Sequence, residues 1–359
     1  MREATESGEQ FRVETMFSRL LQFGVTYGDL MRVTSESSDW ISWSYKLNRV
    51  AETYLSMAAN AADVGSQVSA AHFWRLATIY FHYSQIRVPV SDIKMKRRSQ
   101  TAQAFRNWLK AAGEYVHALD VPFGKIKLPG YLLGRDSSAP LVVLIGGLDS
   151  AKEVELYTLA QEFRVRGMQC FIFDGPGQGE LLTRIPLELR FELVLPTVVD
   201  YLVEHCSASE IGVFGVSLGG HLAARATAAD ERIRGCISIG GFYDTGTLSR
   251  LPAFAAETLR HALAVQNGRS LDQVINGASV ADAAPHMSRP LFLIHGMNDH
   301  LVEEDQMAKF EKWARGNARI WRMEGAEHVC TDRFAECLPV MGDWMKDILS
   351  TNPRSIGTA

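Results

Sequence analysis

The chain lacks a strong net charge and a long apolar run. Its 359 residues include 37 Lys and Arg against 41 Asp and Glu, a formal net charge of −4. This balance gives no electrostatic argument for binding nucleic acid or an anionic membrane surface. No apolar stretch approaches the roughly 20 residues of a membrane-spanning helix. The charged N-terminus lacks the apolar segment of a secretory signal. We therefore expect a cytoplasmic protein with neither nucleic-acid nor membrane partners.

Cysteine is also scarce, with five residues in the chain. The number is odd, and Cys170 and Cys236 fall within apolar stretches expected to be buried strands. This pattern suits reduced thiols in a core better than a disulfide framework. The short basic run 94–98 is expected to be a solvated helix start or loop rather than a binding patch.

The N-terminal part of the chain contains no convincing strand. Apolar and aromatic residues recur at helical spacing in four segments, 11–21, 40–59, 68–86 and 101–119. Gly65 follows a helical pattern at the position of a C-terminal cap. We expect a helical N-terminal cap region over residues 1–120. A helix–helix core is the simpler explanation of its many aromatic residues, and a substrate pocket is the alternative.

The remainder, residues 121–350, alternates buried apolar strands with helical patterns. Strands are expected at 125–133, 139–145, 169–173, 211–214, 235–240, 290–296 and 319–324. This alternation predicts an α/β fold with a mostly parallel, doubly wound sheet covered on both faces. A helical insertion is expected at about 241–289, because connections in such folds are usually shorter. Residues 351–359 form a small, polar tail that we expect to be flexible.

A Gly-x-Ser-x-Gly sequence centred on Ser217 lies between an expected strand and an Ala-rich helix. This is the nucleophile elbow of α/β-hydrolases, in which the serine occupies a strained turn. Asp299 follows the expected strand 290–296, and His328 follows the expected strand 319–324. The order serine, acid, histidine is the order of that fold. An imidazole must accept the serine proton, and a carboxylate must hold the imidazole in its tautomer.

Each of these residues has a simpler interpretation. Ser217 is also compatible with a turn serine, Asp299 with a carboxylate that caps a helix near residue 302, and His328 with a surface histidine. Glu303 and Asp305 are alternative acids. The ordered combination at three strand ends favours a catalytic triad of Ser217, Asp299 and His328, with no metal ion and no cofactor.

Two Gly-rich segments complete the pattern. The loop 146–150 follows the strongest expected strand, and in hydrolases of this fold it supplies one N–H group of the oxyanion hole. The residue after the nucleophile supplies the other. The donors would be Leu218 and either Leu148 or Gly147. The Asp-Gly-Pro-Gly-Gln-Gly sequence of 174–179 is a tight turn typical of the fold.

Five segments, 146–153, 174–180, 215–220, 295–299 and 327–330, resemble one branch of the α/β-hydrolases. This branch contains 2,6-dihydroxypseudooxynicotine hydrolase, the fungal polyketide-shortening hydrolases and FrsA-like esterases, and the N-terminal segments 24–30 and 80–83 are similar too. The resemblance implies hydrolysis of a carbon–carbon bond beside a ketone, a helical region that closes over the site, and a homodimer. It also implies an auxiliary acid at Asp149, where the nicotine-pathway enzyme carries glutamate, and pocket positions at Tyr80, His82 and Tyr83.

We therefore expect a serine hydrolase that cleaves a β-diketone or acyl-phenol type of small molecule through an acyl-enzyme. The same triad would serve a carboxylesterase, a thioesterase or an acyl-transferring cyclase, because an ester needs no special leaving group. A more distant alternative is a ligand-binding protein on a hydrolase scaffold. Substrate class is expected to depend on the helical regions.

Overall fold

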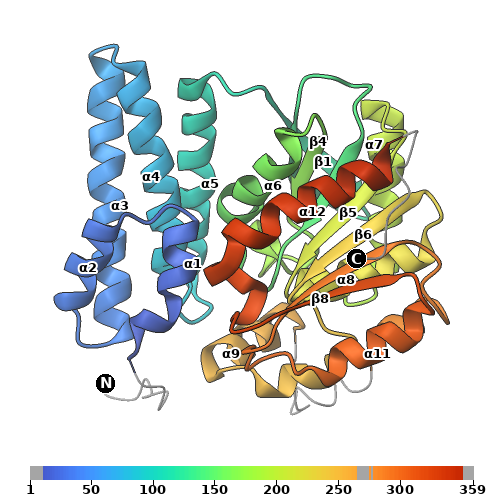
Figure 1. Ribbon diagram of the computed structural model, residues 1–359. Coiled ribbons are helices and arrows are strands. Elements are labelled where there is room, and N and C mark those ends of the chain that lie inside the picture. The colour runs from blue at the N-terminus through green and yellow to red at the C-terminus, as the bar shows by residue number, and fades with distance from the viewer. Residues whose placement is uncertain (1–10, 265–274, 276–277, 351–359) are drawn as a thin grey trace. The chain divides into compact units, whose positions relative to one another are not determined.

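The computed structural model describes residues 11–264, 275 and 278–350, and its backbone is drawn in Figure 1. The chain divides into two compact units. One holds the chain up to Glu114 together with Arg250–His261, and the other holds Tyr115–Ser249 and the chain from Ala262 onward. The predicted flexible tail lies outside the described residues, as does part of the predicted insertion.

The first unit is helical, as the spacing of its apolar residues predicts. Its elements are η1 (Val13–Met16), α1 (Phe17–Gln22), α2 (Tyr27–Ser35), α3 (Trp40–Asp63), α4 (Gln67–Gln85), α5 (Asp92–Ala112) and most of α9 (Ala253–Ala262). Helix α4 packs against both α3 and α5. Asp39 begins α3 with a capping box, in which its carboxylate accepts the Ser42 N–H at 2.7 Å. Gly65 follows the helix at φ +77°, as expected of a C-terminal cap.

The basic run at 94–98 lies in the first turns of α5, but the prediction that it is solvated is wrong for three of its four basic residues, with Lys96 alone exposed. Lys94, Arg97 and Arg98 are at most 9% exposed. The Lys94 ammonium donates to the carbonyls of Gln85 and Val88 beyond the end of α4, at 3.1 and 3.0 Å. These last carbonyls have no partner within the helix, so a buried cation satisfies them. Sequence alone could not distinguish this use of lysine from a solvated one.

The second unit is built on one eight-stranded sheet. Its strands are β1 (Val116–Phe123), β2 (Ile126–Leu133), β3 (Leu141–Ile145), β4 (Gln169–Phe173), β5 (Ile211–Val216), β6 (Ile233–Ile239), β7 (Leu291–Gly296) and β8 (Ala318–Met323). They lie in the order β1-β2-β4-β3-β5-β6-β7-β8. Neighbours from β4 to β8 pair in parallel, and β2 is antiparallel to both β1 and β4. The predicted mostly parallel sheet is confirmed.

Strand β1 is missing from the sequence-based expectation, which assigned residues up to 119 to a helix. Helix α5 ends at Ala112, where Gly113 adopts φ +64° and caps it. The strand then mixes exposed and partly buried residues, with Val121 alone buried, and it includes Pro122. Proline lacks an N–H group and is tolerated at a sheet edge, which is where β1 lies. An edge strand of this kind has neither the apolar run nor the composition that identifies a buried strand.

Helices cover both faces of the sheet. They are the π-helical turn η2 (Lys152–Leu156), α6 (Tyr157–Arg164), α7 (Leu195–Cys206), α8 (Leu218–Ala229), α11 (Asp305–Ala314) and α12 (Phe334–Leu349), with short turns η3 (Gly179–Leu181), η4 (Phe191–Leu193), η5 (Thr245–Arg250), η6 (Val280–Asp282) and η7 (His328–Arg333). A Cβ on Gly212 would meet Met345 of α12, and one on Gly215 would meet Ala223 of α8. Residues three apart on a strand face opposite sides, so α12 and α8 pack on opposite faces of β5.

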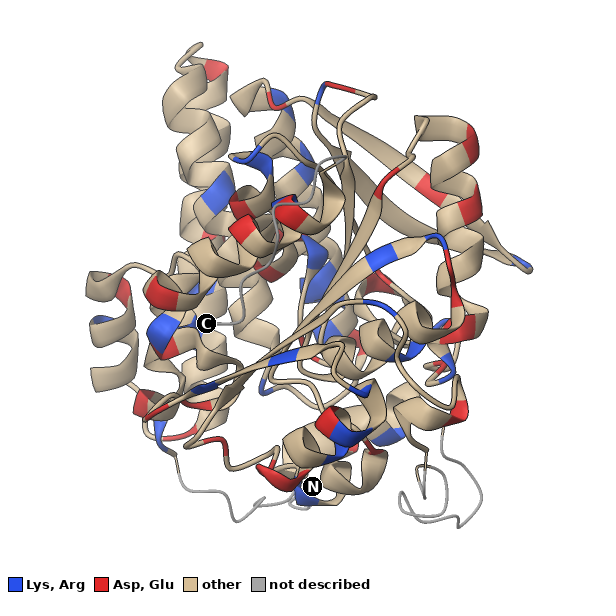
Figure 2. Ribbon diagram, turned by 45° about the vertical axis from the view of Figure 1, so that its right-hand side comes forward, with Lys and Arg blue, Asp and Glu red and all other residues tan. Residues whose placement is uncertain are grey.

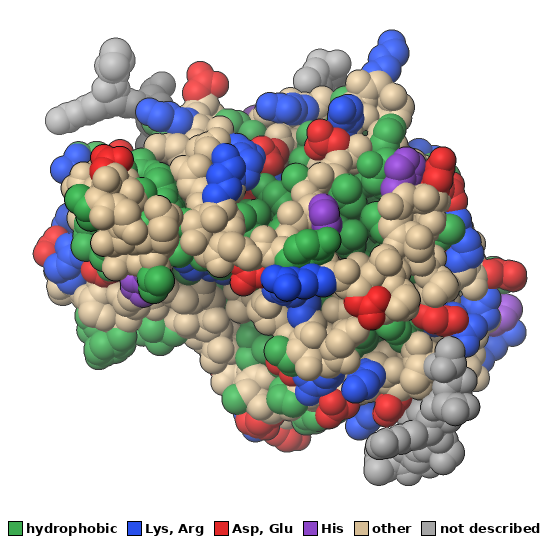
Figure 3. Space-filling model, turned by 90° about the horizontal axis from the view of Figure 1, so that it is seen from above, with side chains coloured by type: hydrophobic (Ala, Val, Ile, Leu, Met, Phe, Trp, Pro, Cys, Tyr) green, Lys and Arg blue, Asp and Glu red, His purple; other side chains and the backbone are tan. Residues whose placement is uncertain are grey.

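Charge is mixed along the chain. Figure 2 shows basic and acidic residues interspersed on helices and strands, and Figure 3 shows them side by side on one face. All five cysteines are free thiols, and Cys206 alone among them is not fully buried. Within the described ranges, no helix combines the length and hydropathy needed to cross a bilayer.

Candidate active site

Ser217 occupies a sharp turn between β5 and α8. Its backbone has φ 55° and ψ −121°, a combination that few residues with a side chain adopt. The flanking glycines explain how the turn fits. A Cβ on Gly215 would overlap the carbonyl of Gly219, and a Cβ on Gly219 would overlap the carbonyl oxygen of Ile145. The predicted elbow geometry is therefore present around Ser217.

Ser217, His328 and Asp299 form a continuous hydrogen-bonded chain. The Ser217 Oγ lies 2.9 Å from the His328 Nε2, and the His328 Nδ1 lies 2.7 Å from the Asp299 Oδ2. An ionised carboxylate can only accept hydrogen bonds, so Nδ1–H donates to Asp299. The neutral imidazole then has a free electron pair on Nε2, which accepts the serine hydroxyl proton. The three residues that the sequence singled out are thus brought together in the order that proton transfer requires.

The Asp299 side chain is fully buried, whereas that of His328 keeps 24% of its surface exposed. The second oxygen of Asp299 accepts the backbone N–H groups of Leu301 and Val302 at 2.8 and 2.9 Å. Burial by itself would raise the pKa of Asp299, but the interaction with His328 and these two N–H groups lower the pKa below its usual value. Asp299 therefore stays charged next to the imidazole.

The alternative acid Asp305 faces elsewhere. It pairs with the Lys309 ammonium at 2.9 Å in the first turn of α11. The interpretation of Asp299 as a helix cap is wrong, because the N–H groups that it accepts belong to Leu301 and Val302 in the loop and the N-cap of α11 is Glu304. The helix itself begins at Asp305 rather than near residue 302.

Two glycines let the histidine loop approach the strand ends. A Cβ on Gly296, the last residue of β7, would overlap the carbonyls of Ala326 and Glu327. A Cβ on Gly240, which follows β6 at φ +61°, would lie 2.9 Å from the Val329 backbone nitrogen. Val329 itself has φ 65°, which is unusual for a β-branched residue. The loop that carries His328 is held in a strained conformation directly against the ends of two parallel strands.

The loop 146–150 lies against the elbow. A Cβ on Gly147 would be 3.3 Å from the Ser217 Cβ and 3.2 Å from the Val216 carbonyl oxygen. The Gly147 N–H donates to the Ser150 Oγ at 3.1 Å. This bond uses the Gly147 donor within the loop, so of the two predicted oxyanion donors here the geometry favours Leu148. Leu218 opens α8, where first-turn N–H groups have no partner within the helix.

The other predicted site residues lie in two places. Asp149 is in the turn next to Leu148 and is partly buried. Tyr80, His82 and Tyr83 are on α4, buried within the helical unit. The Tyr80 hydroxyl donates to Asp29 at 2.9 Å, and burial is the main reason that the pKa of this hydroxyl is raised. The auxiliary role of Asp149 and the pocket role of the three α4 residues remain predictions.

Gln178 and Lys152 have no predicted role from the sequence. Gln178 is 4% exposed, and its amide donates to the Gly146 carbonyl at 2.7 Å. Lys152 is 1% exposed and contacts the carboxylate of Asp174 at 2.6 Å. The sequence alone contains no signal for either residue, because their contacts depend on the pairing of β3 with β4, which brings the loops after these strands together at one edge of the sheet.

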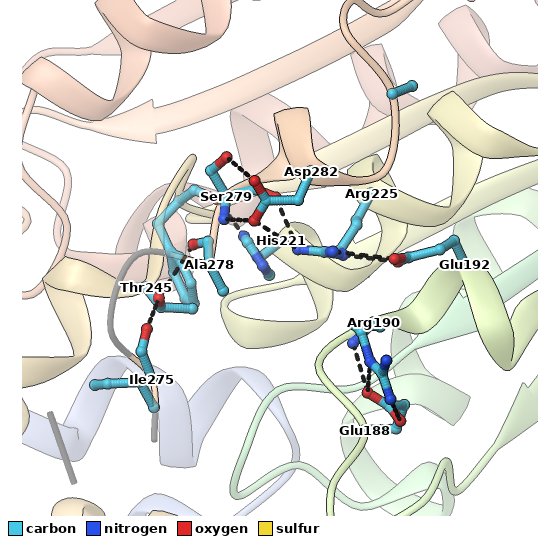
Figure 4. A network of polar contacts seen from close by, with 12 residues as sticks. Glu188, Arg190, Glu192, His221, Arg225, Thr245, Ile275, Ala278, Ser279 and Asp282 are labelled. Atoms are coloured by element: carbon cyan, nitrogen blue, oxygen red, sulfur yellow. Dashed lines mark hydrogen bonds and ion pairs between the residues drawn. The ribbon is translucent and has the colours of Figure 1, made fainter. Parts of the chain in front are cut away.

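Helix α8 is anchored at its far end by a buried ion pair, shown in Figure 4. Arg225 is 3% exposed and holds Glu192 through two hydrogen bonds of 2.7 and 3.0 Å. Its third nitrogen donates to the Ser279 carbonyl at 2.7 Å. One turn earlier, His221 is buried beside the Phe242 ring, and burial lowers its pKa to about 4. Buried polar groups thus fix the helix whose first turn follows Ser217.

A metal site would need several ligating side chains in one place. Among the residues that the structure describes, no group of three or more His, Cys, Asp or Glu could hold a metal ion.

Comparison with known proteins agrees with the fold. Residues 139–287 match the model of the alpha/beta hydrolase fold. The chain is 24% identical over 338 residues to 2,6-dihydropseudooxynicotine hydrolase of Paenarthrobacter nicotinovorans, covering 93% of this chain and 91% of that one. It is 31% identical over 237 residues to 20-hydroxy-prefusarin hydrolase of Gibberella moniliformis, covering 59% of this chain and 55% of the fungal one.

The crystal structure of 2,6-dihydroxy-pseudo-oxynicotine hydrolase has the same fold. It superposes with a TM-score of 0.83 at 23% identity, over 94% of this chain and 98% of that one. The predicted resemblance to this branch is confirmed. The matched fold, the mostly parallel sheet and these relatives identify the chain as an enzyme with the α/β-hydrolase fold.

Proposed function

We propose that the chain is a serine hydrolase that cleaves a carbon–carbon bond beside a ketone through an acyl-enzyme. Ser217 acts as nucleophile, His328 as general base and acid, and Asp299 as the residue that orients the imidazole. The observation that carries the proposal is the chain of contacts Ser217 Oγ to His328 Nε2 at 2.9 Å and His328 Nδ1 to Asp299 Oδ2 at 2.7 Å. This is the arrangement that activates a serine hydroxyl.

The oxyanion of the tetrahedral intermediate is bound by the backbone N–H groups of Leu218 and Leu148. The support is local: Leu218 opens a helix, whose positive end favours negative charge, and the neighbouring Gly147 N–H is already donated to Ser150. Two fixed donors cost little reorganisation when the charge develops.

The reaction proceeds in two halves. In the first, His328 takes the Ser217 proton as Oγ bonds to the substrate ketone carbon, and the carbonyl electron pair becomes the oxyanion. When the carbonyl re-forms, the bond to the neighbouring carbon breaks, and that carbon leaves with the electron pair and takes the proton from His328. In the second, His328 deprotonates a water molecule whose oxygen bonds to the acyl carbon. When the carbonyl re-forms, the bond between this carbon and the Ser217 Oγ breaks, Ser217 takes the proton from His328, and the acyl group leaves as a carboxylic acid.

The triad does not select the bond that is cleaved, so the proposal of a carbon–carbon bond depends on the family resemblance. When such a bond breaks, the substrate itself must stabilise the leaving carbanion. A β-diketone or an acyl group on an electron-rich phenol ring provides that stabilisation. The two relatives named above are called hydrolases of 2,6-dihydropseudooxynicotine and 20-hydroxy-prefusarin. For the present chain, we propose a substrate of this ketone-bearing class. The proposal also includes a homodimeric assembly, and a division of the chain into a helical cap region (1–120) and a catalytic region (121–350).

A carboxylesterase, thioesterase or acyl-transferring cyclase would use the same residues. Parallel assays on aryl β-diketones and on p-nitrophenyl esters separate the two, since efficient turnover of the esters alone would favour the esterase. The ligand-binding alternative predicts binding of such compounds without turnover of either.

The test of the nucleophile is Ser217→Ala. We expect at least a ~10³-fold loss of turnover with unchanged far-ultraviolet circular dichroism and retained substrate binding. Incubation of the wild type with a fluorophosphonate should add one phosphonyl group, located at Ser217 by peptide mass spectrometry. Activity of the alanine variant above a few per cent of the wild type would remove Ser217 from this role.

A further inference from the structure

The peptide between Gly146 and Gly147 is held at both of its polar ends. Its carbonyl oxygen accepts the Gln178 amide at 2.7 Å, and its N–H donates to the Ser150 Oγ at 3.1 Å. Since a peptide unit is planar, two such contacts fix its orientation. The next N–H along the chain belongs to Leu148. The orientation of the Gly146–Gly147 peptide therefore influences the direction in which the Leu148 N–H group points.

Gln178 is itself tightly confined. It is 4% exposed, and a Cβ on Gly175 would lie 2.6 Å from its Oε1. A carbonyl oxygen cannot donate, so the side-chain amide must turn its Nε2 toward Gly146. Loss of this donor would leave the Gly146 carbonyl buried without its partner, which costs free energy and permits the peptide to rotate.

Lys152, which follows the loop 146–150, holds the Gly-rich turn that contains Gln178. Its ammonium contacts the carboxylates of Asp174 at 2.6 Å and Glu180 at 2.7 Å. Asp174 and Glu180 are the residues at the two ends of the Gly-rich turn, and the Asp174 carboxylate also accepts the Glu180 N–H at 3.0 Å. Lys152 follows Ser150 by two residues, so one buried cation holds together the turn after β4 and the loop after β3.

We propose that Gln178 is a positioning residue for the oxyanion hole, and that Lys152 holds the turn from which Gln178 acts. The inference rests on the proposed function, because it requires Leu148 to be an oxyanion donor. Neither side chain touches the substrate. Their effect is to fix one peptide plane, and this contact matters most when negative charge develops on the substrate oxygen.

The experiment compares Gln178→Leu with Gln169→Leu. Gln169 is a matched control: it is 3% exposed, donates its amide to the Ala139 carbonyl at 3.3 Å, and begins β4, at the end of the strand opposite to the turn that carries Gln178. For each variant we measure kcat and KM on a p-nitrophenyl ester or an aryl β-diketone, whichever the wild type turns over. We also measure the inhibition constant of a phenylboronic acid, whose tetrahedral adduct with serine places an oxygen in the oxyanion hole.

We expect Gln178→Leu to lower kcat by about 10- to 100-fold, less than the removal of a whole donor, with KM within threefold of the wild type. The boronic acid should bind at least tenfold more weakly to it. Gln169→Leu should leave both quantities within twofold of the wild type. Lys152→Met should follow Gln178→Leu in kcat and boronic acid affinity, and should also unfold at a lower temperature.

Equal boronic acid affinity and kcat in Gln178→Leu and the wild type would overturn the inference, while fluorophosphonate labelling of wild-type Ser217 would show that the proposed function still stands. A wild type that is neither labelled nor active would overturn both. If Gln178→Leu fails to fold, Gln178→Met replaces it. Methionine has a similar length and no hydrogen-bond donor, so the same loss is expected and its absence counts equally against the inference.

Discussion

Gly219 packs directly against the carbonyl oxygen of Ile145, so closely that a Cβ on Gly219 would overlap this oxygen and also the carbonyl of Gly146. Ile145 ends β3 and Gly219 is the second residue of α8. The loop with one proposed oxyanion donor and the helix with the other are thus in van der Waals contact. The second glycine of the Gly-x-Ser-x-Gly sequence therefore sets the spacing between the two donors.

Gly219→Ala should displace this contact. The overlapping atoms belong to the backbone and cannot rotate away, so either the loop 146–150 or the start of α8 must shift. We expect kcat to fall by about 10- to 1000-fold, the range seen when an oxyanion donor is lost or misplaced. Gly28→Ala is the control, because a Cβ there meets no atom within 4 Å, and it should leave kcat unchanged. A fully active Gly219→Ala would contradict this account.

Asp299→Asn tests the acid of the proposed triad. The asparagine can keep the contacts to the Leu301 and Val302 N–H groups, but its NH₂ group toward His328 would favour the tautomer with the proton on Nε2. That tautomer cannot accept the serine proton, so we expect a loss of about 10⁴-fold in kcat with little change in stability. Asp305→Asn is the matched control and should retain activity, because Asp305 pairs with Lys309. The reverse result would assign the acid to Asp305.

Much of this architecture could be read from the sequence because it depends on local signals. The strands that bear the site are apolar and buried, and their loops contain residues with specific chemistry. Strand β4 begins and ends at the predicted residues, and Ser217, Asp299 and His328 each follow a strand near its predicted end. The carboxyl ends of parallel strands lie at one edge of a sheet, so chain order was enough to bring these three residues together.

What the sequence did not reveal depends on partners distant along the chain. Strand β1 is amphipathic and contains proline, so it is identified only by its pairing with β2. Lys94 looks like a surface residue until the end of α4 is placed beside it. Gln178 acquires a role only when Gly146 is 2.7 Å away, a contact that spans 32 residues. The amino-acid types in β1 and at Lys94 and Gln178 are common ones, and only the surrounding structure shows what each contributes.

Arg225→Met should destabilise the second unit, which is built on the sheet. Arg225 and Glu192 are 3% and 16% exposed in their side chains, and loss of one partner leaves a largely buried charge. We expect roughly 3–5 kcal/mol less free energy of unfolding, measured by urea denaturation. The double variant Arg225→Met, Glu192→Leu should recover part of that loss. Arg190→Met removes an exposed pair with Glu188 and should cost less than about 1 kcal/mol. Equal effects of the two single variants would contradict the structural distinction between them.

Glu153 makes the stability of the second unit depend on pH. Its carboxyl shares the Lys152 ammonium, at 2.7 Å, with Asp174 and Glu180, so one buried cation faces three carboxylates. Burial raises the pKa of Glu153 to about 7, with the repulsion of the two other carboxylates adding to burial and Lys152 opposing it. The folded state therefore binds more protons than the unfolded chain between about pH 4.5 and 7. In this window the contribution of Glu153 to stability falls as pH rises, and above the folded pKa it is lost.

Glu153→Gln removes this dependence, because glutamine does not titrate and still offers an oxygen to Lys152. We expect the difference in unfolding free energy between variant and wild type to move in favour of the variant by roughly 1–3 kcal/mol from pH 5 to pH 8, measured by urea denaturation at each pH. Glu336→Gln is the control. The hydrogen bond from Arg333 is the main reason that the pKa of Glu336 is lowered, so it titrates below this window and its variant should parallel the wild type. A Glu153→Gln curve parallel to that of the wild type would show that Glu153 is already ionised at pH 5. The Lys152 cluster would then carry its full negative charge throughout the range in which the enzyme is assayed.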